Sequence, residues 1–129
     1  MSDNNKTKVL IIEDDSYISD MYRIKFESEN FETIVASNGI EGIKLLEKMV
    51  PDIILLDIVM PKIDGFSVLK EIKKNPKLDK IPVILLTNLS QKENVERGFE
   101  LGASSYIIKA HFTPSEVVEK IKEVLKQEL

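Results

Sequence analysis

Residues 53–57 of the chain read IILLD, so four consecutive apolar side chains stand directly before an aspartate, Asp57. A strand with one solvent-facing side alternates apolar and polar residues, whereas a continuous apolar run indicates a strand buried on both faces. Four other segments have the same character, which makes five expected strands in all. They cover residues 9–12, 33–36, 53–56, 83–86 and 106–108.

The segments between these strands have helical spacing, and several begin with a capping signal. TPSE at 113–116 is a capping box with proline at the first helical position, SQKE at 90–93 repeats the box, and NGIE at 38–41 is a weaker version. Strand and helix therefore alternate five times. Crossovers of this length return right-handed onto a parallel sheet, so the sequence predicts a doubly wound α/β fold with helices on both faces.

Four single residues are assigned to helix ends on local chemistry. Asp15 or Ser16 is expected to cap the helix that follows the first strand. Gly98 and Gly102 are expected to be capping and turn residues at the end of a short polar helix.

The length and composition fit one ordinary domain. The 129 residues include 43% hydrophobic and 31% charged side chains, which is the balance of a packed globular protein. Residues 1–7 are expected to form a flexible polar tail, which leaves 8–129 for the domain. No segment has the pattern of a secretory signal or a membrane span, so a cytoplasmic location is expected. The net charge of −4 disfavours direct nucleic-acid binding, and the absence of cysteine excludes disulfides and thiolate metal sites.

Four of the five expected strands are followed by polar side chains that together form a candidate site. Glu13 and Asp14 come after the first strand, Asp57 after the third, Thr87 after the fourth and Lys109 after the fifth. In open parallel α/β sheets, ligands gather at the carboxyl ends of the strands. These five side chains are therefore the candidate site.

The three carboxylates of this candidate site predict a bound cation. Like charges brought together at a partly buried place repel one another at a cost of several kcal/mol unless a positive charge lies among them. Mg²⁺ prefers oxygen ligands and keeps part of its water shell in such sites, and Lys109 adds further positive charge. With Asp57 as nucleophile and Thr87 as hydroxyl donor, the set contains the parts that phosphoryl transfer needs. One acid after a strand often only caps a helix, so the prediction depends on all five residues together.

Four motifs in this order, VLIIEDD, IILLDIVMPKIDG, VILLT and YIIK, resemble the signature of response-regulator receiver domains of two-component signalling. The resemblance covers about residues 8–125, and the spacing is most similar to single-domain chemotaxis regulators. It implies a flavodoxin-like, doubly wound five-stranded parallel sheet with strand order 2-1-3-4-5. It implies a phospho-accepting signalling domain that catalyses only its own phosphoryl transfer and slow dephosphorylation. It also implies Mg²⁺ as cofactor, a histidine kinase or phosphotransfer protein as donor, and a downstream effector protein as partner.

The resemblance implies a role for each residue of the site. Asp57 is the phospho-acceptor, Asp14 a direct Mg²⁺ ligand and Glu13 a ligand acting through water, while the Val59 carbonyl completes the protein ligands. Thr87 and Lys109 grip the phosphoryl oxygens, and Tyr106 is the aromatic switch that turns inward when Thr87 moves. The loop under the acceptor is shaped by Met60, Pro61, Asp64 and Gly65.

The sequence departs from the family pattern after Lys109. Receivers usually have a proline there in a cis peptide, and this chain has Ala110. A cis bond before alanine costs about 3 kcal/mol, so either the fold enforces it or the loop is rebuilt with a trans bond.

Other departures concern the lifetime of the phosphorylated state and self-association. The two positions that usually tune self-dephosphorylation hold Val59 and Leu89, which cannot orient an attacking water, and Asn88 replaces a small residue that usually follows the Thr. A long-lived phosphorylated state is therefore expected. Residues 104–105 are two serines in place of the acidic pair of dimeric transcriptional receivers, so a monomer or weak dimer is expected.

Three other classes of protein share parts of this pattern. A haloacid-dehalogenase phosphatase needs a second acid where Val59 stands, and a flavin mononucleotide carrier needs a first loop that does not repel phosphate, unlike residues 13–15. A receiver-like adaptor that binds partners without being phosphorylated stays open as the alternative. Treatment with a small phosphodonor and Mg²⁺ separates this adaptor from a true receiver.

Overall fold

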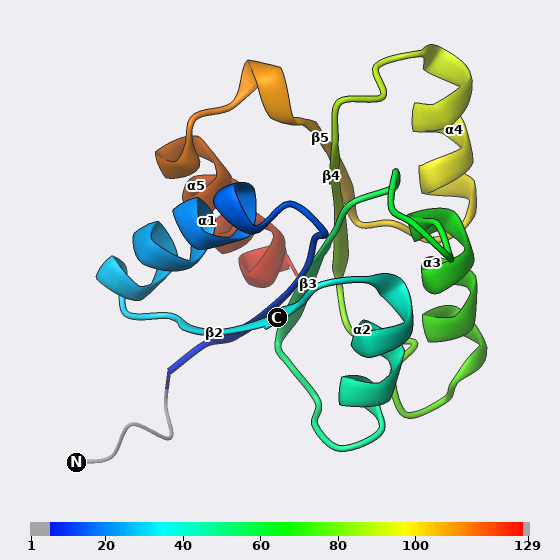
Figure 1. Cartoon of the computed structure of the whole chain (residues 1–129), viewed down its shortest axis with the longest axis horizontal. Helices are drawn as coiled ribbons and strands as arrows, with labels where there is room; N and C mark the ends of the chain where they lie inside the picture. Colours follow the sequence, from blue (N-terminus) through cyan, green and yellow to red (C-terminus); the bar gives the residue numbers. More distant parts are fainter. Residues whose placement is uncertain (1–5, 128–129) are drawn as a thin grey trace.

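The computed structural model of the chain describes residues 6–127 and contains one five-stranded parallel sheet in the order β2-β1-β3-β4-β5 (Figure 1). This confirms the predicted fold class and strand order. Each predicted strand lies within an observed one, and no boundary differs by more than one residue. The strands are β1 (Lys8–Ile12), β2 (Glu32–Ala36), β3 (Ile53–Leu56), β4 (Val83–Thr87) and β5 (Ser105–Ile108).

Within residues 6–127, five α-helices cover the two faces of the sheet, α1 and α5 on one side and α2, α3 and α4 on the other (Figure 1). Successive strand residues point to opposite faces, so each face receives its own apolar layer. In β1, for example, Leu10 and Ile12 belong to the core under α2 and α3, while Val9 and Ile11 belong to the core under α1 and α5. The helices are α1 (Ser16–Ser28), α2 (Gly39–Leu46), α3 (Gly65–Lys74), α4 (Lys92–Glu100) and α5 (Pro114–Gln127).

Three of the predicted helix starts are confirmed by their hydrogen bonds. The Asp15 carboxylate accepts from the backbone N–H of the first turn of α1, and Asn38 does the same for α2. At α5, Thr113 and Glu116 form the reciprocal capping box, because each side chain accepts a hydrogen bond from the backbone N–H of the other residue.

The capping box predicted from Ser90 to Glu93 is wrong. The helical hydrogen bonds of α4 start at the carbonyl of Gln91, which accepts from the N–H groups of Asn94 and Val95. Gln91 is therefore the N-cap residue, and its side chain makes no capping hydrogen bond. This one-residue shift places Glu93 too early in the helix to reach back to Ser90 as a capping box requires.

The two glycines near the end of α4 have different structural roles. Gly102 is the turn residue that was predicted, with a φ of 107° that favours glycine. Gly98 is not a cap but lies buried within α4, so the prediction for it is wrong. A Cβ at this position would come within 2.6 Å of Leu85 Cδ1, so the missing side chain lets the helix approach the sheet closely.

The described chain begins close to β2. The carbonyl of Thr7 accepts a hydrogen bond of 2.8 Å from the N–H of Glu32, so the strand-like pairing reaches one residue before β1. The tail prediction falls mainly on residues 1–5, which lie outside the described residues, as do residues 128–129. Among the helices of residues 6–127, none has the length and apolar character needed to span a membrane.

Candidate functional site

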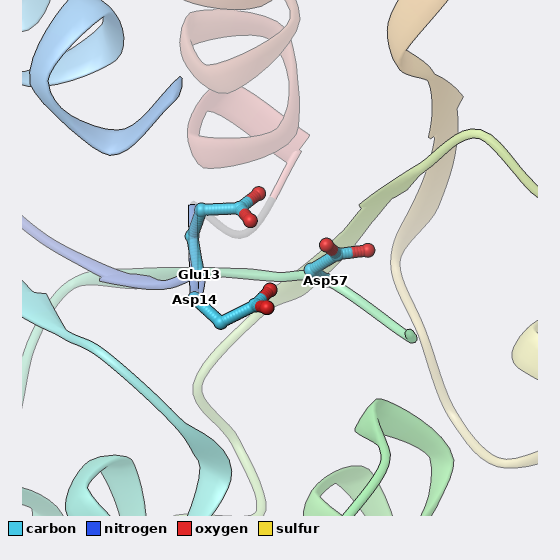
Figure 2. A group of neighbouring side chains, drawn as sticks. All are labelled: Glu13, Asp14 and Asp57. Atoms are coloured by element: carbon cyan, nitrogen blue, oxygen red, sulfur yellow. The ribbon is translucent and has the colours of Figure 1, made fainter. Parts of the chain in front are cut away.

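The carboxyl ends of β1 and β3 bring three acidic side chains together. The two strands pair in parallel with Ile12 opposite Leu56, and the N–H of Asp57 donates to the Ile12 carbonyl at 3.0 Å. The residues after each strand therefore meet at the same edge of the sheet. One carboxylate oxygen from each of Glu13, Asp14 and Asp57 lies within 4.8 Å of the others (Figure 2).

Lys109 reaches this acidic cluster from the far end of the sheet. It stands directly after β5, in the 3₁₀ turn η2 (Lys109–His111), and the peptide bond to Ala110 is trans. The trans bond is the second of the two possibilities raised by the sequence, and it does not displace the lysine. Its Nζ donates to Glu13 Oε1 at 2.5 Å and to Asp57 Oδ2 at 3.0 Å.

For both Glu13 and Lys109, burial shifts the pKa in the direction opposite to the shift caused by the hydrogen bond between them. Glu13 is only 4% exposed, and burial raises the pKa of its carboxyl to about 6, against the hydrogen bond from Lys109. Burial alone would lower the pKa of Lys109, but the hydrogen bond from Nζ to Glu13 and the charge of Asp57 outweigh it and raise the pKa. The lysine is therefore held in its charged form by the two acids that it contacts.

Asp57 is held by the tight loop that follows it. Its Oδ1 accepts from the N–H of Ile58 at 2.7 Å, and the N–H of Gly65 donates to the Ile58 carbonyl at 2.8 Å. The start of α3 is thereby drawn against the backbone that follows Asp57. A Cβ on Gly65 would lie 2.1 Å from the Asp57 carbonyl oxygen, so only glycine fits. Asp64 adds rigidity by capping α3 through its bond with the N–H of Ser67.

The other predicted residues lie around the neighbouring strands. Thr87 is the last residue of β4 and is 1% exposed, and its Oγ1 accepts a long bond of 3.4 Å from the N–H of Leu89. The hydroxyl of Tyr106 donates to the carbonyl of Leu89 at 2.7 Å, and burial, followed by the charge of Asp57, raises the pKa of this phenol. The side chain of Val59 is exposed. The roles that the resemblance implies for these residues stay predictions.

Two features at this edge were not anticipated from the sequence. Tyr22 of α1 is 2% exposed and closes the inner side of the site beside Glu13 and Asp57. Asn88 Oδ1 accepts a hydrogen bond of 3.2 Å from the N–H of Ala110, which joins the loops after β4 and β5. The sequence marked Asn88 and Ala110 as separate departures, and no local pattern connects residues that stand 22 positions apart.

The fold and the acidic strand-end site together define a class, that of phospho-accepting signalling domains rather than enzymes with a separate substrate. The family described as the response regulator receiver domain matches residues 9–122. The chain belongs to this family, which confirms the resemblance.

Known relatives and solved structures agree with this assignment. The chain is 35% identical over 93% of its length to the DNA-binding dual master transcriptional regulator RpaA of Synechocystis, and 36% identical over 98% to the transcriptional regulatory protein ResD of Bacillus subtilis. It covers 49% and 51% of these proteins, so it spans about half the length of the curated relatives it matches. A CheY-like receiver domain from Methanospirillum hungatei superimposes with a TM-score of 0.89 at 29% identity, covering 96% of this chain and 97% of that one.

Receiver domains bind Mg²⁺ at an acidic pocket, and the donor set of this chain fits that ion. All three side chains offer carboxylate oxygens, the ligand type that Mg²⁺ prefers. Asp14 is exposed, so solvent and ions have access to the cluster. Among the described residues, Lys109 is the only ammonium in hydrogen-bond contact with the cluster, and it cannot neutralise three carboxylates.

Proposed function

We propose that Asp57 accepts a phosphoryl group from a phosphohistidine of a partner kinase or phosphotransfer protein, in a reaction that needs Mg²⁺. The observation that supports this most strongly is the convergence of Glu13, Asp14 and Asp57 on one point, with Lys109 bonded to two of them. Glu13, Asp14, Asp57 and the Val59 carbonyl would hold the ion. When bound, Mg²⁺ supplies positive charge that offsets the repulsion between the carboxylates and the phosphoryl oxygens.

The transfer step requires a carboxylate nucleophile in a fixed position. An oxygen of Asp57 attacks the phosphorus, a new O–P bond forms and the N–P bond of the phosphohistidine breaks. The imidazole leaves with the electron pair and takes up a proton from solvent. Asp57 is suited to this step because its second oxygen is fixed by the N–H of Ile58, and because Lys109 already lies at hydrogen-bond distance to stabilise the transferred charge.

Phosphorylation then shifts the chain between two conformations. A phosphoryl group biases the equilibrium only through contacts that differ between the two states. Thr87 and Lys109 would make these contacts, and the loop that follows Thr87 would carry the change to Tyr106 through the hydrogen bond at the Leu89 carbonyl. The altered surface around α4 and β5 is the output, which a downstream effector protein recognises.

The relatives supply the biological setting of the proposal. The proteins in Synechocystis and Bacillus subtilis are transcriptional regulators, and the receiver-like part covers about half of each. We place this chain in a two-component pathway in the cytoplasm, with a histidine kinase as phosphodonor. Because Ser104 and Ser105 replace an acidic pair, the receiver itself is proposed to be a monomer or weak dimer that makes no direct contact with nucleic acid.

The decisive experiment is incubation with acetyl phosphate and Mg²⁺, followed by intact mass spectrometry. The wild-type chain should gain the mass of one phosphoryl group, and the gain should require Mg²⁺. Asp57→Asn should abolish it, whereas Asp20→Asn, an exposed acid on α1, should leave it intact. An unmodified wild-type chain would favour the phosphorylation-independent adaptor. In the same assay, loss of the phosphoryl group within seconds would reject the long-lived state expected from Val59 and Leu89.

A further inference from the structure

The loops after β4 and β5 are joined by one side-chain hydrogen bond. Asn88, the residue after Thr87, accepts through Oδ1 from the N–H of Ala110, the residue after Lys109, at 3.2 Å. The bond therefore connects the immediate neighbours of the two residues that contact the phosphoryl group in the proposed function. It lies on the peptide unit between Lys109 and Ala110, so it acts directly on the orientation of that peptide.

Apart from the ion pairs of the Lys109 side chain with Glu13 and Asp57, the turn that carries Lys109 has few contacts that hold its backbone. It is a single 3₁₀ turn in which Ala110 and His111 are exposed, so no apolar burial anchors these two residues. Its closing backbone bond, from the N–H of Phe112 to the Lys109 carbonyl, is long at 3.3 Å. The Asn88 contact is the only side-chain hydrogen bond to the backbone of this turn among residues 6–127.

The chemistry of position 110 makes this contact possible. Proline has no backbone N–H, so a chain with proline at position 110 cannot form the bond. Alanine provides the donor, and the amide of Asn88 provides an acceptor of the right length one residue past β4. The two sequence departures are therefore two halves of one interaction.

We propose that Asn88 is a positioning residue: through the N–H of Ala110 it orients the Lys109–Ala110 peptide and so holds Lys109 Nζ within reach of Asp57. The inference rests on the proposed function and adds to it. In this chain a side-chain hydrogen bond performs the task of a rigid proline, and it ties the Lys109 turn to the Thr87 loop. If Asn88 instead acted only by its bulk over the phosphoryl group, its removal would not slow phosphorylation, or its effect would not depend on the residue at position 110.

The test is a double-mutant cycle on the rate of phosphorylation. Asn88→Ala should reduce the maximal rate with acetyl phosphate at saturating Mg²⁺ by roughly three- to tenfold, the factor that one net hydrogen bond supplies. The control is Ser90→Ala on the same loop, which should leave the rate unchanged. In an Ala110→Pro background, which lacks the donor, Asn88→Ala should have no further effect. An equal effect in both backgrounds, or a faster reaction, would mean that Asn88 acts by bulk and would overturn the inference.

A second measurement does not depend on phosphorylation. Amide exchange followed by NMR without Mg²⁺ should show faster exchange of the Ala110 N–H in Asn88→Ala, and slow exchange in Asn88→Asp, which keeps an acceptor oxygen. If exchange at Ala110 is the same in all three proteins, the inference fails while the proposed function stands. If wild type shows the protected amide but takes up no phosphoryl group, the proposed function fails and the role of Asn88 in it fails with it.

Discussion

Helices α3 and α4 lie on the same face of the sheet but are held to it very differently (Figure 1). Helix α3 begins with an aspartate cap and buries five residues: Gly65, Phe66, Val68, Leu69 and Ile72. Helix α4 begins at Gln91 without a side-chain cap, and of its nine residues, all of them described, only Gly98 is buried. Arg97 lies 4.4 Å above the ring of Phe66 and links the two helices at their surface.

The difference in capping and burial between α3 and α4 divides the candidate site into two parts. Asp57, the proposed phospho-acceptor, belongs to what we call the α3 side, residues 53–74, where packing and capping fix the backbone. Thr87, Tyr106 and Lys109 belong to what we call the α4 side, residues 87–111, where Ala103 and Ile107 are the only buried apolar side chains and polar contacts join the loops. Segments with few buried apolar contacts open at lower free energy. Under the proposed function, the nucleophile thus lies on the more closely packed part of the site, and the response to phosphorylation on the part with fewer buried apolar side chains.

The largest difference in stability between the two helices is expected when their buried glycines, Gly65 in α3 and Gly98 in α4, are each replaced by alanine. Gly65→Ala places a Cβ 2.1 Å from backbone oxygen on the α3 side and should cost about 3 kcal/mol or more in the free energy of unfolding. Gly98→Ala meets Leu85 Cδ1, a side-chain atom that can shift, and alanine gains about 1 kcal/mol in helix propensity, so the net change should be below about 1 kcal/mol. Urea unfolding of both variants gives the comparison, and equal losses would contradict it.

The next effect concerns the ion pair that joins β1 to the α4 side. Glu13 has an ordinary pKa of 4.5 and a pKa of about 6 in the folded chain, so between these values the folded state binds more protons than the unfolded state. Without Mg²⁺, the free energy of unfolding should therefore fall as the pH rises from 4.5 to 6, by at most about 2 kcal/mol. Denaturation in EDTA across this range measures the slope. Glu13→Gln should remove this contribution, and an unchanged slope in that variant would show that other groups cause it.

A smaller effect is expected from the hydroxyl that braces the loop after β4. Tyr106→Phe removes the donor to the Leu89 carbonyl and should cost about 1 kcal/mol of stability. Hydrogen exchange should become faster in α4 and stay unchanged in α3, because the lost bond belongs to the α4 side. A uniform increase across both helices would mean that the two sides open together.

The smallest effect is expected from a substitution that gives α4 a side-chain N-cap, which α3 has and α4 lacks. Gln91→Asp supplies the missing cap and a favourable charge at the helix N-terminus, and should stabilise the chain by about 0.5–1 kcal/mol. Thermal or urea unfolding detects such a gain, and slower exchange at the start of α4 locates it. A loss of stability would show that Gln91 makes a contribution that its exposed position does not reveal.

Sequence patterns predicted the features that depend on local order and failed where tertiary contacts decide. The strands and the acidic edge follow from continuous apolar runs and from parallel pairing, which brings residues 13, 14 and 57 to one place. The cap of α4 was misplaced because the chain starts this helix from the Gln91 carbonyl, one residue beyond the Ser90 signal. The prediction for Gly98 is wrong because a glycine near a helix end usually terminates the helix, whereas this one lies buried inside α4 and packs closely on Leu85. The Asn88–Ala110 bond has no local signal at all.

The long separation of the residues in the Lys109 ion pairs has a consequence for synthesis on the ribosome. Lys109 is 52 residues from Asp57 and 96 from Glu13. At roughly 5–20 residues per second, translation adds the lysine about 3–10 s after the aspartate. During that interval a nascent chain carries the acids without their ammonium partner. The acidic cluster therefore gains its ammonium partner only after β5, the last strand of the sheet along the sequence, has been synthesised.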